Sequence, residues 1–170
     1  SQTYLKNKKL MSIRPLLPSD EIAYRNFFYK LKKETVYLRF FQNINVFSHK
    51  MAQDHWSDLD YRNNISLICQ VRNKGNKEIV AIGTYAGLKD AQAEVAFVVR
   101  EDFQGLGIAT YLLMKLEEIA KENGYKRFLA TILRKNKSMG HIFLKRYPSA
   151  IIENSASDIE FTMDFNQKIQ

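Results

Sequence analysis

The segment Gln104-Gly105-Leu106-Gly107-Ile108-Ala109 restricts the folds open to this chain more than any other part of the sequence. It follows an apolar, strand-like run at residues 93–99 and precedes an amphipathic helical pattern at residues 112–120. Glycine lets the backbone adopt positive φ angles and leaves room beside it for another molecule. The first amides of a helix have no intrahelical partner, and the helix dipole is positive at that end. A strand, a glycine-containing loop and a helix in this order therefore predict a phosphate-binding site.

Two widespread phosphate loops do not fit this segment. A dinucleotide-binding G-x-G-x-x-G loop would need a glycine where the chain has Thr110. A Walker A loop would need Gly-Lys followed by Ser or Thr, and no such sequence follows. On the two glycines alone, the plain alternative of a strand-to-helix turn that binds nothing stays open.

The composition indicates one soluble globular domain. A chain of 170 residues with 45% hydrophobic and 26% charged residues can build a core, and it does not resemble a disordered protein. The longest uncharged apolar-rich stretch, residues 79–88, is far shorter than the ~20 residues that a bilayer requires, and no secretion signal opens the chain. The single Cys69 excludes an internal disulfide framework and is interpreted as a packing residue, and His49, His55 and His141 are scattered. We therefore expect a cytoplasmic, metal-free domain that binds no membrane.

The first residues and the net charge indicate the domain boundary and the kind of partner that the chain binds. Residues 1–9 are polar and rich in lysine and are interpreted as an N-terminal arm or linker, which leaves residues 10–170 as the domain. Because the chain starts at Ser1 rather than Met, we expect a piece of a longer protein, and fusion to another domain stays open. A net charge of +8 favours a polyanionic partner such as a phosphate-rich cofactor. No nucleic-acid recognition motif occurs, so we do not expect nucleic acid as a partner.

The apolar pattern predicts antiparallel strands first and a strand-helix-strand-helix unit afterwards. In residues 65–71, apolar residues alternate with Ser66 and Gln70, which predicts a half-buried strand. Asn123-Gly124 is a helix stop signal after the glycine-containing loop and its helix. The result is a mixed α/β domain of the α+β type with a largely antiparallel sheet. The expected strands are residues 10–16, 65–71, 78–88, 93–99, 127–133, 150–153 and 159–164, and the expected helices start after Ser19, Thr35, Ser48, the glycine loop and Asn136.

Two motifs resemble those of the GNAT superfamily of acyltransferases. The segment Gln104–Ala109 matches the pyrophosphate signature Q/R-x-x-G-x-G/A, and Ile132-Leu133-Arg134-Lys135-Asn136-Lys137-Ser138-Met139 is similar to the second motif, L-x-x-N-x-x-M. The resemblance covers residues 10–148. Further segments are similar to one subgroup in particular. This subgroup consists of the GNAT domains of bacterial protein lysine acetyltransferases and of fusions with acyl-CoA synthetase or CoA-transferase modules. The segments similar to that subgroup are Ser12-Ile13-Arg14-Pro15, Thr35-Val36-Tyr37-Leu38-Arg39-Phe40-Phe41, Asp60-Tyr61 and Ala93-Glu94-Val95-Ala96-Phe97-Val98-Val99.

The resemblance implies a GNAT fold, with a mixed, mostly antiparallel central sheet of about six or seven strands flanked by helices. It implies acetyl-CoA as the cosubstrate, no metal, and a primary amine as the acceptor, with a protein lysine side chain expected. The residues at cofactor-binding positions of the family are Phe97, Val98, Val99, Gln104, Gly105, Leu106, Gly107, Ile108, Ala109, Thr110, Asn136 and Met139.

Glu94 is the expected general base. A lysine amine has an ordinary pKa of ~10.4, so a base must remove its proton directly or through water. Glu94 lies in an apolar strand, where desolvation would raise the pKa of its carboxyl, and the matching position in the subgroup is an acid with that role. The alternative is a glutamate that faces solvent.

The chain departs from the family where a general acid is usual. Many GNAT enzymes have a tyrosine seven residues after the motif asparagine; here that position is Phe143, and Tyr147-Pro148 replaces the usual Gly-Phe. The thiolate then leaves unassisted or takes a proton from water or another tyrosine. Asn136 is interpreted either as a cofactor ligand or as a helix cap.

Three functions follow from these patterns. The main expectation is acetylation of a protein lysine. Acetylation of a small-molecule amine uses the same chemistry and stays open. A CoA-sensing regulatory domain of a larger protein also stays open, because Phe143 cannot donate a proton. The basic residues Arg134, Lys135 and Lys137 around Asn136 are expected to add to cofactor affinity.

Overall fold

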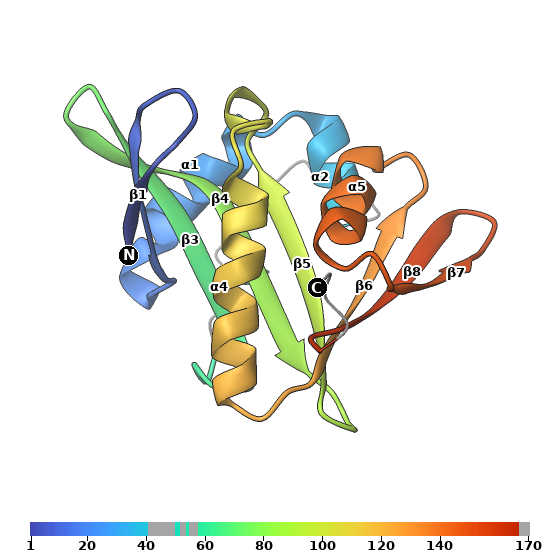
Figure 1. Ribbon diagram of the computed structural model, residues 1–170. Helices are drawn as coiled ribbons and strands as arrows, with labels where there is room; N and C mark the ends of the chain where they lie inside the picture. The colour runs from blue at the N-terminus through green and yellow to red at the C-terminus, as the bar shows by residue number, and fades with distance from the viewer. Residues whose placement is uncertain (41–49, 52–53, 55–57, 167–170) are drawn as a thin grey trace.

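The computed structural model describes residues 1–40, 50–51, 54 and 58–166 (Figure 1). Phe41, Ser48, His49 and His55 lie outside these ranges. In the described part, the strands form one sheet in the order β1-β2-β3-β4-β5-β6-β8-β7. Neighbouring strands are antiparallel except β5 and β6, which are parallel. The predicted α/β fold with a mixed, mostly antiparallel sheet is confirmed. The strands are β1 (Gln2–Tyr4), β2 (Leu10–Pro15), β3 (Asn64–Asn73), β4 (Asn76–Gly87), β5 (Gln92–Val99), β6 (Arg127–Leu133), β7 (Ile151–Asn154) and β8 (Asp158–Asp164).

Over the described residues the sheet has eight strands rather than six or seven, because the first residues add a strand to its border. β1 pairs with β2 in an antiparallel hairpin, with Gln2 opposite Ser12. Leu5, directly after β1, is only 5% exposed and joins the main hydrophobic core. Part of the segment interpreted as an arm is therefore folded onto the domain.

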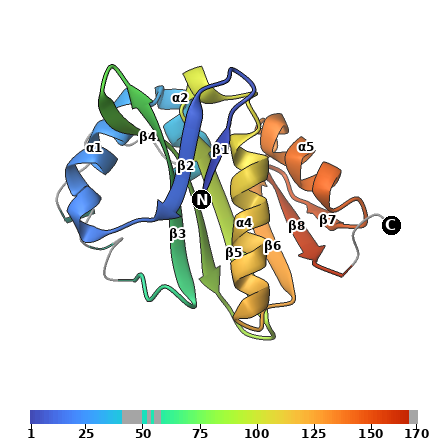
Figure 2. The ribbon, with the colours of Figure 1, turned by 60° about the vertical axis from the view of Figure 1, so that its left-hand side comes forward.

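Helices cover both faces of the sheet (Figures 1 and 2). α4 (Ile108–Glu122) and α5 (Lys137–Arg146) pack on one face, and α1 (Glu21–Lys30) and α2 (Lys33–Phe40) pack on the other. Short 3₁₀ helices, η1 (Pro18–Asp20) and η2 (Glu101–Phe103), precede α1 and the glycine loop. No helix in the described part of the chain has the length and apolar character needed to cross a bilayer.

Coverage of both faces corrects the expectation of a half-buried strand at residues 65–71. Ser66 and Gln70 are buried, although their polarity suggested a solvated face. They lie on the side of β3 that α1 and α2 cover, where Ile68 belongs to the second core cluster. Cys69 is a packing residue as predicted, since its Sγ lies 3.3 Å from the Sδ of Met11 inside the core.

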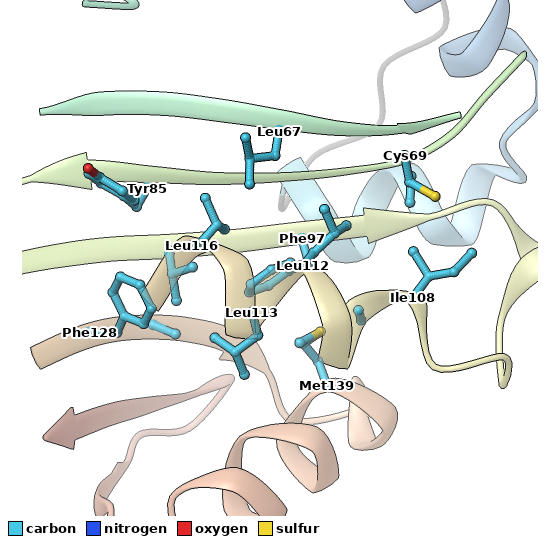
Figure 3. Packing of buried hydrophobic residues seen from close by; sticks show 14 of the residues in the cluster. Leu67, Cys69, Tyr85, Phe97, Ile108, Leu112, Leu113, Leu116, Phe128 and Met139 are labelled. Atoms are coloured by element: carbon cyan, nitrogen blue, oxygen red, sulfur yellow. The ribbon is translucent and has the colours of Figure 1, made fainter. Parts of the chain in front are cut away.

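The apolar stripe of α4 holds this helix against the middle of the sheet. Leu112, Leu113 and Leu116 are fully buried in the main hydrophobic core (Figure 3). Burial of each such side chain stabilises the fold by about 1.5–3 kcal/mol. Gly83 in β4 leaves room for the ring of Phe97 and for Leu116 of α4. A Cβ at this position would lie 2.9 Å from the ring and 3.2 Å from the Cδ1 of Leu116. The N-terminal end of α4 is thereby held at the glycine loop.

Candidate active site

Strands β5 and β6 pair over a short distance and then separate. Only three residue pairs join them, from Gln92 opposite Arg127 to Glu94 opposite Leu129. Beyond this point the two strands diverge (Figure 1). Alternate backbone groups of residues 95–99 therefore point toward the opening instead of toward a neighbouring strand.

A cleft of about 440 Å³ occupies this region. The residues predicted to bind the cofactor come together there from β5, the glycine loop and α5. Leu106 is the exception, because it packs against the hydrophobic core and does not line the cleft. The predicted residues that line the cleft are Phe97, Val98, Val99, Gln104, Gly105, Gly107, Ile108, Ala109, Thr110, Asn136 and Met139.

The glycine loop has the geometry of an anion site. Gly105 and Gly107 have φ angles of 75° and 89°, and a Cβ at either position would meet nothing within 4 Å. Within the described residues, the backbone amides of residues 105–110 donate no hydrogen bond. The Nε2 of Gln104 donates to the carbonyl of Val99 at 3.0 Å and ties the loop to β5. Free amides, open space and a helix N-terminus fit a phosphate-bearing cofactor.

Asn136 is the N-cap of α5. Its Oδ1 accepts a hydrogen bond from the amide of Met139 at 3.4 Å, so the capping interpretation describes the geometry. Because Asn136 also lines the cleft, its role as a cofactor ligand stays a prediction.

Glu94 does not lie among core side chains, which corrects the expectation of desolvation. Side chains alternate along β5, so Ala93, Val95 and Phe97 face α4 while Glu94 faces the side of α2. Glu94 is exposed and does not line the cleft. It belongs to the last β5–β6 pair, opposite Leu129, and therefore lies where the two strands begin to separate.

Arg39 of α2 supplies a cation on the same side of the sheet. It lines the cleft together with Thr35 and Leu38 of the same helix. Burial lowers the pKa of Arg39, while the negative forms of Tyr24 and Glu94 act in the opposite direction. An arginine stays protonated in proteins, so Arg39 carries a positive charge. Its side chain is close enough to Glu94 for the two to interact electrostatically. Sequence patterns did not single out Arg39, because tertiary packing alone brings α2 to the cleft.

The basic cluster near Asn136 does not line the cleft. Arg134 donates from Nε to the carbonyl of Ser155 at 2.7 Å, and the Nζ of Lys135 lies 4.6 Å from the centre of the Tyr37 ring. Two other lysines line the cleft instead, Lys6 from the β1–β2 hairpin and Lys145 from α5. Neither has a local sequence signal, so the sequence prediction missed both.

Phe143 and Tyr147 are both placed away from the cleft. Phe143 is fully buried and its ring packs against Phe97 and Phe161. The hydroxyl of Tyr147 donates to Oε1 of Glu117 at 2.6 Å, and burial, reinforced by this hydrogen bond, raises the pKa of Tyr147. Neither side chain is placed to give a proton to a group in the cleft. Among the described residues, no three His, Cys, Asp or Glu side chains gather in a way that could hold a metal ion.

Comparison with known proteins identifies the family. A sequence profile described as the acetyltransferase (GNAT) family matches residues 29–146. The chain belongs to the GNAT family. An acetyltransferase of Pseudomonas aeruginosa is 30% identical to this GNAT domain over 128 residues, which cover 75% of the chain and 68% of that protein.

One further sequence relative and two solved structures are similar to the GNAT domain. Acetyltransferase Pat of Mycolicibacterium smegmatis is 30% identical over 130 residues, which cover 76% of this chain but only 38% of that protein. The GNAT domain of S. lividans PAT superimposes with a TM-score of 0.84 at 23% identity, covering 97% of this chain and 96% of that one. A Salmonella typhimurium structure described with its cofactor acetyl-CoA gives a TM-score of 0.70 at 13% identity, covering 94% and 96% of the two chains. The chain is an acetyl-CoA-dependent acetyltransferase domain with the GNAT fold.

Proposed function

We propose that this domain transfers the acetyl group of acetyl-CoA to a primary amine, and that the acceptor is a lysine side chain of a protein. The observation that supports the proposal is the cleft that runs from the open glycine loop along β5, where this strand has separated from β6. The similarity to acetyltransferase Pat and to the S. lividans PAT domain supports it, as does the resemblance of residues 35–41 and 93–99 to protein lysine acetyltransferases.

Different residues along this cleft bind different parts of acetyl-CoA. The free amides of residues 105–110 hold the pyrophosphate, helped by the positive end of α4. The backbone groups of residues 95–98 that point toward the opening orient the extended arm of the cofactor. When bound, acetyl-CoA supplies the acetyl thioester that the amine attacks.

Glu94 receives the proton of the amine in this proposal. It lies at the closed end of the strand separation without lining the cleft, so a water molecule carries the proton to its carboxylate. The positively charged Arg39 interacts electrostatically with Glu94 on the same side of the sheet. Since Phe143 and Tyr147 cannot donate a proton at the cleft, the leaving thiolate takes its proton from water.

One observation favours a second function, a CoA-sensing domain that regulates a larger protein. Phe143 is buried where many relatives have a tyrosine, so the domain has the cofactor site without that acid. A sensor would bind acetyl-CoA and acetylate no amine.

The substitution Glu94→Gln separates these functions. Glutamine keeps the shape of the side chain but cannot accept a proton. We expect nearly unchanged acetyl-CoA binding and a turnover lowered by ~10²-fold or more, measured as CoA released with lysine peptides and candidate acceptor proteins. The loss should shrink at high pH, where the amine is deprotonated without a base.

Glu160→Gln, an exposed change on β8, is the matched control and should keep full turnover. Full activity of Glu94→Gln would keep the enzyme and remove Glu94 as its base. A wild type that binds acetyl-CoA but acetylates no amine would favour the sensor.

A further inference from the structure

The turn of the β1–β2 hairpin lies beside the glycine loop, although the two are about a hundred residues apart in the sequence (Figures 1 and 2). The Nζ of Lys9 lies 5.5 Å from the centre of the Phe103 ring, and Phe103 directly precedes Gln104. On the other flank of the loop, the hydroxyl of Ser1 lies 3.4 Å from the hydroxyl of Tyr111 in α4. The hairpin therefore contacts both sides of the phosphate-binding segment.

Hydrogen bonds within the turn hold it in one conformation. The amide of Leu5 donates to the carbonyl of Lys9 at 2.9 Å, and the amide of Lys8 donates to the carbonyl of Leu5 at 2.8 Å. The amide of Lys9 also donates to Oδ1 of Asn7 at 3.1 Å. The Leu5 side chain is anchored in the same core cluster as Phe103. Lys6, the next residue, is consequently held at a defined place beside the loop.

Lys6 is the residue of this turn that lines the cleft. Its side chain forms no hydrogen bond and no ion pair with any described residue, and it is exposed. The glycine loop across the cleft offers amide donors that are equally without acceptors. An ammonium group and a row of free amides around one space form a site for an anion, because both supply only hydrogen-bond donors and positive charge.

We propose that Lys6 binds a phosphate group of acetyl-CoA, so that the N-terminal hairpin forms a second wall of the phosphate site. This inference rests on the proposed use of acetyl-CoA by the domain. Coenzyme A has a pyrophosphate and a 3′-phosphate, and an ammonium group recognises both by the same chemistry. Lys6 makes the hairpin a part of the cofactor site.

The test is the dissociation constant of acetyl-CoA, measured by calorimetric titration of the whole chain without any acceptor. Lys6→Ala should raise this constant about tenfold, which corresponds to about 1.4 kcal/mol, and Lys6→Arg should stay near the wild-type value. Lys8→Ala is the matched control. It removes the same charge from an exposed position in the same turn that does not line the cleft, so its dissociation constant should equal that of the wild type.

Titration with acetyl-3′-dephospho-CoA tells which phosphate Lys6 contacts. A penalty that persists with this analogue assigns Lys6 to the pyrophosphate, and a penalty that disappears assigns it to the 3′-phosphate; both results support the proposal. An unchanged constant in Lys6→Ala, or an equal loss in Lys8→Ala, would overturn it. A wild type that does not bind acetyl-CoA would instead overturn the proposed function.

Discussion

Replacing Gly107 by glutamate should abolish acetyl-CoA binding and leave the free protein folded. Gly107 has a φ of 89°, and a Cβ there would meet nothing within 4 Å, so the free protein suffers no clash. The remaining cost is that of an L-residue in the left-handed region, about 1–2 kcal/mol. At about 2–4 °C for each kcal/mol in a domain of this size, the melting temperature should fall by roughly 2–8 °C. With the cofactor present, the added carboxylate occupies the place of a phosphate and repels it.

Thermal unfolding with and without acetyl-CoA measures both effects. A ligand at ~100 times its dissociation constant adds ~2.7 kcal/mol to the stability of the native state. The melting temperature of the wild type should therefore rise by about 5–11 °C with acetyl-CoA, and that of Gly107→Glu should not rise.

Gly124 supplies the control for Gly107. It lies just beyond the other end of α4, has a φ of 88°, and also leaves its Cβ position free of contacts within 4 Å. Gly124→Glu should lose similar stability from backbone strain and keep the full shift with acetyl-CoA. A normal shift in Gly107→Glu, or a lost shift in Gly124→Glu, would refute the assignment of the loop to the phosphates.

Two further predictions concern stability. Tyr147→Phe removes the hydroxyl that donates to buried Glu117 at 2.6 Å, and the loss of a hydrogen bond to a charged acceptor, about 1.5–3 kcal/mol, should lower the melting temperature by roughly 3–12 °C. The exposed control Tyr4→Phe should melt like the wild type, and equal melting of both variants would contradict the argument. The hydrogen bond from Arg14 lowers the pKa of the Asp20 carboxyl. The ionised carboxylate therefore stabilises the fold at a pH above the ordinary carboxyl pKa. This stabilisation is lost as the pH falls through the lowered pKa of Asp20. Asp20→Asn should therefore be less stable than the wild type at neutral pH and lose less stability on acidification, as urea unfolding from pH 7 to 2 can measure; parallel pH profiles would disprove it.

Local signals in the sequence were sufficient for the unit that carries the cleft. Apolar alternation and the Asn123-Gly124 stop signal placed the strand after α4 at residues 127–133, and β6 spans Arg127–Leu133. The helix predicted to start after Asn136 is α5, which spans Lys137–Arg146. The local sequence pattern determines β6 and α5, so both could be predicted without knowing which segments pack against them.

The composition of the cleft walls depends on contacts between distant segments. Lys6 and Arg39 line the cleft because a hairpin and a helix from the first forty residues pack near the glycine loop and β5. No periodicity within those segments indicates this. The exposure of Glu94 was predicted wrongly for a related reason, since alternation along β5 shows that two faces exist but not which face a helix covers at that point.

The separation of β5 from β6 places an unpaired strand edge inside the sheet rather than at its border. At a border, such an edge is a template on which other protein molecules can add a strand and aggregate. Here α2 contacts both strands on one face, and on the other face α5 packs its Phe143 against Phe97 of β5 and brings Gly140 close to Ile132 of β6. A foreign β-strand projects side chains to both faces and would collide with these helices, whereas a thin chain that has amide groups but no branches could enter. The domain can thus keep open hydrogen-bonding groups in its sheet for a slender ligand without offering them to another protein.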